Sequence, residues 1–82
     1  MEEGYIQKYE PSEIDSKKLE NNFKYHTPKE DQAVRYENIR DAAKKFAKTL
    51  AALCPPSREL SVALTELETA VMWANASIAR NE

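Results

Sequence analysis

The chain has 82 residues, of which 41% are hydrophobic and 32% are charged, and its formal net charge is -2. This length allows one small domain, which excludes a multi-domain enzyme, and the apolar content excludes a wholly disordered protein. A single glycine, a single cysteine and the lack of a long apolar run exclude a glycine-rich phosphate loop, an internal disulfide and a transmembrane helix. We therefore expect a cytoplasmic protein that has no contact with a membrane.

The charge is distributed unevenly along the chain. Residues 33–54 carry five basic and two acidic side chains, whereas the flanking segments are acidic overall. An acidic protein has no overall attraction for polyanionic DNA, so we expect no DNA partner. Lys44, Lys45 and Lys48 lie in the basic segment, and a run of this kind is usually a solvated helix face.

Residues 1–11 mix charged and apolar side chains without a period, which predicts an N-terminal arm. Residues 12–82 are expected to form one helical domain. In its first part, Ser12 or Asp15 is a suitable N-cap, and apolar residues follow at helical spacing, which predicts a short helix over residues 12–24.

A long second helix is indicated from Pro28 onward. The segment Thr27-Pro28-Lys29-Glu30 has the residues of a capping box, with proline at the first helical position, and it predicts a helix start near Pro28. Pro55-Pro56 must end this helix because proline lacks the amide donor. Between these points apolar side chains recur in steps of three and four residues, at Tyr36, Ile39, Ala43, Phe46, Leu50 and Leu53.

A third helix follows the two prolines. Ser57 is a suitable N-cap, and Glu59 lies in the first turn, where the helix dipole favours an acid. Apolar residues then repeat at Leu60, Leu64, Leu67, Val71, Ala74 and Ile78. Two helices of matching length joined by a tight turn predict an all-α fold, in which a long antiparallel hairpin follows the short leading helix.

Antiparallel pairing brings the start of the second helix next to the end of the third. This open end of the hairpin gathers cations, aromatic rings and amides, which together suit a small anionic nucleotide. A salt-bridged interface between subunits is the alternative interpretation of the same charges. The residues concerned are Tyr25, His26, Lys29, Arg35, Tyr36, Arg40, Trp73, Asn75, Arg80 and Asn81.

The sequence offers little support for catalysis. His26 is expected at the open end and Cys54 at the turn, so the two cannot form a nucleophile and base within one chain. With one histidine and no converging carboxylates, we expect no metal ion and no cofactor. Glu66 and Glu68 are better explained as a solvated face than as a pair of catalytic acids.

Self-association is expected from the small size of the predicted core. Two long helices and a short one bury little apolar surface, and the conformational entropy of folding cancels most of its effect. A stripe of small residues beside the apolar positions of the third helix, Ala63, Ala70 and Ser77, would let another helix approach closely.

Four motifs occur in order along the chain from residue 22 to its end. Together they resemble the bacteriophage anti-CBASS cyclic-nucleotide sponge family, whose hairpin is shared with a phage anti-Thoeris sponge. The motifs are Asn22-Phe23-Lys24-Tyr25-His26-Thr27-Pro28 with Asp31-Gln32, Arg35-Tyr36-Glu37-x-Ile39-Arg40, Pro56-Ser57-Arg58-Glu59-Leu60-Ser61-x-Ala63-Leu64-Thr65-x-Leu67-Glu68, and Met72-Trp73-Ala74-Asn75-Ala76-x-Ile78-Ala79-Arg80-Asn81-Glu82.

The resemblance implies a protein that is not an enzyme and that assembles as a homo-oligomer, a hexamer. Such a sponge sequesters the cyclic di- or trinucleotides of antiphage signalling, such as cyclic GMP-AMP, in the cytoplasm of the infected bacterial host. Its motifs imply that Tyr25 stacks on a base beside a hydrogen bond from His26, and that Arg40 and Arg80 bind phosphate. Further ligand-binding candidates, which could instead hold a subunit interface, are Lys29, Arg35, Trp73 and Asn75. A helical protein-interaction module with no nucleotide ligand is the alternative function.

Overall fold

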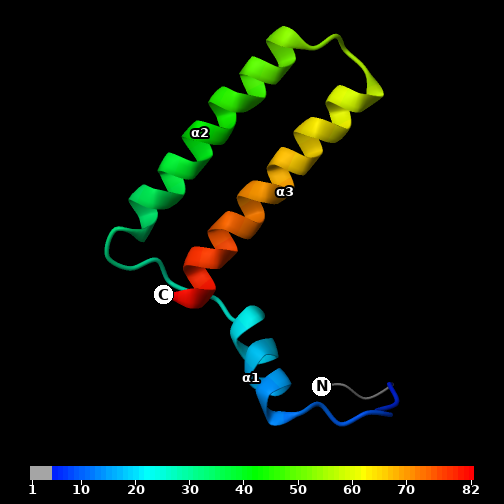
Figure 1. Ribbon diagram of the computed structural model, residues 1–82. Helices are drawn as coiled ribbons and strands as arrows, with labels where there is room; N and C mark the ends of the chain where they lie inside the picture. Colours follow the sequence, from blue (N-terminus) through cyan, green and yellow to red (C-terminus); the bar gives the residue numbers. More distant parts are fainter. Residues whose placement is uncertain (1–4) are drawn as a thin grey trace.

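A computed structural model describes residues 5–82 and contains three helices in this part of the chain (Figure 1). They are α1 (Glu13–Asn22), α2 (Gln32–Leu53) and α3 (Arg58–Asn81). No strand occurs among the described residues, which confirms the all-α prediction. The two long helices lie side by side and run in opposite directions, so the predicted hairpin is present.

The turn between the long helices follows from local chemistry. The α2 helix ends at Leu53, before the two prolines, and the Cys54 amide closes its last turn by donating to the Leu50 carbonyl at 2.9 Å. At the start of α3, the Ser57 hydroxyl accepts a hydrogen bond from the Leu60 amide at 3.1 Å. The predicted helix end and the predicted N-cap are both confirmed.

The start of α2 differs from the sequence prediction. The helix begins at Gln32, four residues after Pro28, and no capping box forms. Glu30 instead adopts a left-handed conformation, with φ 53°, and reverses the chain direction. The Gln32 side chain accepts from the Lys29 amide at 3.1 Å and donates to the Glu82 carboxylate at 3.2 Å. A contact with the far end of the chain thus replaces the local cap.

The interface between α2 and α3 is thin. All six apolar positions predicted on α3 are half-buried, as are Tyr36, Ile39, Ala43 and Leu50 on α2. The prediction was wrong for Phe46 and Leu53, which are 53% and 78% exposed. In a helix with 3.6 residues per turn, these two positions turn away from α3. The half-buried Ala47 occupies the place at the interface that was predicted for Phe46. No apolar side chain of the described residues is fully buried.

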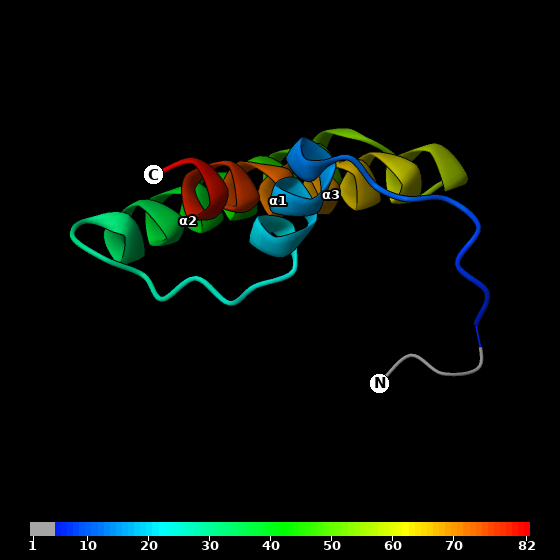
Figure 2. The same cartoon turned by 90° about the horizontal axis from the view of Figure 1, so that it is seen from below.

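The short α1 helix begins where the sequence indicates, because the Ser12 hydroxyl accepts from the Asp15 amide at 3.1 Å. Its last turn meets the end of α3 through Asn21. The arm before α1 extends away from the helices (Figure 2). The arm is described only from Tyr5 onward, so Met1 to Gly4 of the predicted arm lie outside the described residues. Within the described part, no helix is long and apolar enough to cross a bilayer.

Candidate functional site

The open end of the hairpin is held together by hydrogen bonds between segments that are far apart in sequence. The Asn21 side-chain amide of α1 donates to the Arg80 carbonyl of α3 at 3.1 Å. His26 Nε2 lies 2.8 Å from the Asn21 carbonyl oxygen, so this ring nitrogen donates its proton there. The first bond joins α1 to α3, and the second holds the loop of residues 23–31 against the end of α1.

All eight predicted ligand-binding residues lie at this open end. They line or adjoin three surface depressions, and Arg80 lines all three. The α2–α3 depression is the one lined by Arg40, Asn75 and Arg80, and the loop depression is the one lined by Tyr25, Lys29 and Arg80. The α1–α3 groove is lined by Lys18, Trp73 and Arg80. Arg80 is therefore the side chain around which the candidate site is arranged.

The α2–α3 depression has a volume of about 460 Å³, within the range of about 300 to 1,000 Å³ that is usual for small-molecule sites. Its walls include Arg40 and Arg80, and neither guanidinium pairs with a carboxylate of the described residues. Asn75 lines the same depression, and its Oδ1 atom is buried without a hydrogen-bond partner. A buried acceptor without a partner is costly, so this atom is suited to accept from a ligand.

The loop depression is lined by Tyr25, His26, Lys29 and Arg80. The Tyr25 ring is 80% exposed, which leaves its faces free for stacking. His26 is half-buried, and its Nε2 atom is already bonded to the Asn21 carbonyl. In a neutral ring the remaining nitrogen, Nδ1, is an acceptor, whereas the family resemblance implied a donor.

Arg35 is engaged within the chain. Its guanidinium donates to both Glu82 carboxylate oxygens, one of them at 2.8 Å, and lies 3.1 Å from the Asp31 carboxylate. Hydrogen bonds from Arg35, and secondarily from Gln32, lower the pKa of Glu82 to about 2. The bond to Glu82 is also the main reason that the pKa of Arg35 is raised. Arg35 therefore ties α2 to the end of α3, and its donors are directed at protein carboxylates.

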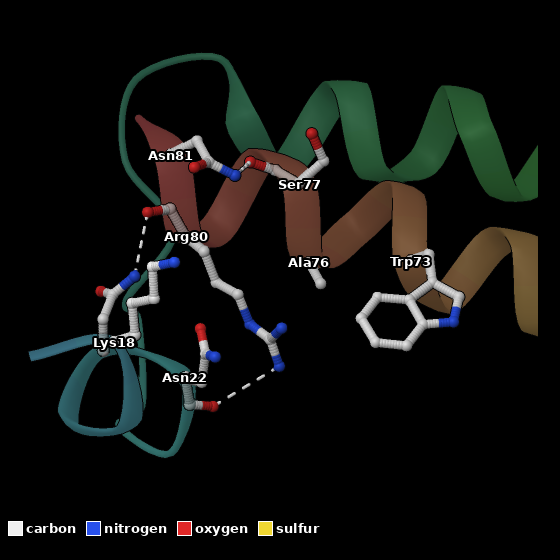
Figure 3. A pocket seen from close by; sticks show the side chains of 8 residues that line it. Lys18, Asn22, Trp73, Ala76, Ser77, Arg80 and Asn81 are labelled. Atoms are coloured by element: carbon white, nitrogen blue, oxygen red, sulfur yellow. Dashed lines mark hydrogen bonds between the residues drawn. The ribbon is translucent and has the colours of Figure 1, made fainter. Parts of the chain in front are cut away.

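Trp73 faces the third depression, the α1–α3 groove (Figure 3). The Arg80 guanidinium lies 5.9 Å from the centre of its ring, in a cation–π contact. The groove also contains Lys18 and Asn22, which the sequence analysis did not select. Helical periodicity gave no signal for them, because it does not say where a short helix packs when an irregular loop separates it from the hairpin.

The arrangement contains no familiar catalytic set. Among residues 5–82, no group of three or more histidine, cysteine, aspartate or glutamate side chains could hold a metal ion. Cys54 caps the end of α2 at the turn, whereas His26 is at the open end. What the open end offers is a set of unpaired cations, exposed rings and amides, which is a binding chemistry.

The fold and the candidate site together define a small helical-hairpin protein with a polar, cation-rich open end. The family model described as the Acb2/Tad1 hairpin domain matches residues 15–79. The chain therefore belongs to the anti-CBASS and anti-Thoeris sponge family, as its sequence motifs indicated. No curated protein and no solved structure matches the chain.

Proposed function

We propose that the protein binds and sequesters cyclic oligonucleotide messengers without cleaving them, and so blocks antiphage signalling in the cytoplasm of the bacterial host. The observation that supports this most strongly is the convergence of Arg40, Arg80 and Tyr25 around adjoining depressions in a chain of the sponge family. Cyclic di- and trinucleotides such as cyclic GMP-AMP combine phosphodiesters with flat bases. Guanidinium groups and aromatic faces recognise these two features.

Each ligand-binding residue has a role that its position supports. Arg40 and Arg80 contact phosphate, and Tyr25 stacks on a base. Asn75 Oδ1 accepts a hydrogen bond from a base amino group, which gives this buried atom the partner that it lacks. Lys29 adds a positive charge at the rim of the loop depression.

Sequestration requires that the protein bind the messenger tightly and be present in numbers comparable to it, but it requires no chemical reaction. The sponge competes with the effector protein that the messenger would activate, and each 1.4 kcal/mol of binding free energy shifts that competition about tenfold. A protein that only binds must release an unchanged ligand on denaturation. This property separates the proposal from a messenger-cleaving enzyme.

Assembly into a homo-oligomer, a hexamer in the family resemblance, is part of the proposal. The chain exposes 7182 Å², whereas a compact monomer of 9.4 kDa exposes about 5,000 Å². Its radius of gyration is 18.1 Å, against about 12 Å for a compact chain of this length. The excess of roughly 2,000 Å² is comparable to the area that a subunit of an obligate oligomer buries, and Phe46 and Leu53 are among the exposed apolar side chains.

The test is isothermal titration of the full chain with cyclic di- and trinucleotides, followed by denaturation and analysis of the released ligand. We expect saturable binding of at least one messenger and its recovery intact. The absence of heat with every messenger would favour the alternative, a helical protein-interaction module. Recovery of linear products would show an enzyme.

A further inference from the structure

The α1–α3 groove brings Lys18, which belongs to none of the sequence motifs, together with Trp73 and Arg80. It has a volume of about 390 Å³ and lies between the last turns of α1 and α3. Lys18 and Asn22 line it from α1, and Trp73, Ser77 and Arg80 line it from α3. In Figure 3 the Arg80 side chain lies between Lys18 and Trp73.

Two cations in the groove lack an anionic partner among the described residues. Neither Lys18 nor Arg80 forms an ion pair with a carboxylate of the described residues, although Asp15 lies one turn before Lys18 on α1. Within residues 5–82 the Arg80 guanidinium donates one hydrogen bond, a long one of 3.5 Å to the Asn22 carbonyl. A guanidinium has five N–H donors, so most of its donor capacity is available to a ligand. An anion placed here would also remove the repulsion between the two cations.

The groove also presents a flat aromatic surface. The Trp73 side chain is 64% exposed, although it is the largest apolar side chain of α3. Its contact with Arg80, at 5.9 Å from the ring centre, holds the guanidinium next to an exposed indole. Cations that can bind a phosphate, placed beside a ring on which a base can stack, match the two parts of one nucleotide unit of a cyclic oligonucleotide.

We propose that the α1–α3 groove binds a phosphodiester of the cyclic oligonucleotide, with Lys18 and Arg80 contacting the phosphate and the Trp73 ring stacking on the adjoining base. This inference rests on the proposed function and adds Lys18 to the ligand-binding residues. It also gives α1 a role, because α1 is joined to α3 through polar groups such as the Asn21 side chain. A ligand that bridges Lys18 and Arg80 strengthens this attachment.

The experiment compares Lys18→Gln with Lys17→Gln in the full chain. Lys17 is the neighbouring exposed lysine of α1 but does not line the groove, so it controls for the loss of one positive charge. Titrations with cyclic GMP-AMP and cyclic triadenylate should show binding about tenfold or more weaker for Lys18→Gln, and unchanged for Lys17→Gln. Lys18→Arg, which keeps the charge, should retain most of the affinity.

Trp73 provides a second, local readout because it is the only tryptophan of the chain. Ligand should change its fluorescence in the unmodified protein and in Lys17→Gln, with a smaller change in Lys18→Gln at the same ligand concentration. Equal affinity of Lys18→Gln and the unmodified protein, or binding that leaves Trp73 emission unchanged, overturns the inference but not the proposed function. An unmodified protein that binds none of the messengers overturns both.

Discussion

At the scale of single residues, the candidate site is organised by which cations are already paired. Arg35 is bonded to two carboxylates, whereas Arg40 and Arg80 have no carboxylate partner among the described residues. Unpaired guanidinium groups near a depression are free to bind phosphate, and paired ones must first give up a protein partner. The same residue type therefore has two different roles within one end of the hairpin.

Replacement of Arg40 by alanine should weaken messenger binding by about tenfold to a hundredfold, because a charge-assisted hydrogen bond to phosphate is lost. Isothermal titration measures the change. Lys44→Ala is the matched control, since Lys44 is exposed one turn further along α2 and does not line the depression. A disassembled Arg40→Ala protein would show that Arg40 holds an interface instead.

Replacement of Tyr25 by alanine should lower dinucleotide affinity while leaving the oligomer intact. The ring is 80% exposed, so its removal leaves no cavity in the chain, and the loss of stacking costs about 1 to 3 kcal/mol per base. Tyr25→Phe keeps the ring and should bind nearly as well as the unmodified protein. Unchanged affinity of Tyr25→Ala would remove Tyr25 from the site.

At the scale of the secondary-structure elements, the ends of α2 and α3 are joined by a polar cluster of Gln32, Arg35 and Glu82. Gln32 is the only buried residue among those described, at 3% exposure, and its side chain contacts both the loop and the Glu82 carboxylate. This cluster sets where α2 begins. It also supports the loop that carries Tyr25 and Lys29.

The cluster predicts an acid-dependent loss of stability. The pKa of Glu82 is lowered from 4.5 to about 2, so its contribution is fully present above about pH 4.5 and is lost as the pH falls toward 2. In Glu82→Gln this part of the pH dependence should disappear. The measurement is the thermal unfolding midpoint between pH 5 and pH 2, which should fall less steeply in Glu82→Gln than in the unmodified protein. Glu68→Gln is the control, because Glu68 is exposed on α3 and forms no ion pair with a described residue. Parallel midpoint curves for Glu82→Gln and the unmodified protein would contradict the prediction.

At the scale of the whole molecule, no apolar side chain among residues 5–82 is fully buried. If the chain assembles as we propose, folding and assembly are linked. Phe46 on α2 is 53% exposed and belongs to the surface that we expect a second copy to cover. The melting temperature should therefore rise with protein concentration. A ligand bound between subunits should raise it further.

Phe46→Glu should shift the protein toward monomers, because it would place a charge in an apolar contact between copies. Light scattering coupled to gel filtration measures the mass. Lys45→Glu is the control, since it places an acid at the preceding residue, about 100° away around the helix. A monomeric unmodified protein at micromolar concentration would refute the assembly proposal.

The sequence by itself determined the features that depend on neighbouring residues. Helix periodicity, the cap at Ser57 and the stop at Pro55-Pro56 each act within one or two turns, so they can be interpreted without knowledge of the fold. For the first helix the sequence offered Ser12 or Asp15 as the cap, and the structure has Ser12. The ordered motifs also indicated the family, which the match over residues 15–79 confirmed.

Only the tertiary structure decided what depends on contacts between distant segments. The start of α2 at Gln32 is fixed by a hydrogen bond to Glu82, 50 residues away, which outcompetes the capping box predicted at Pro28. The partner of Arg35 and the entry of Lys18 into the α1–α3 groove likewise follow from how the chain ends meet. Local patterns do not contain these facts, because the free energy of a long-range contact depends on the path of the whole chain.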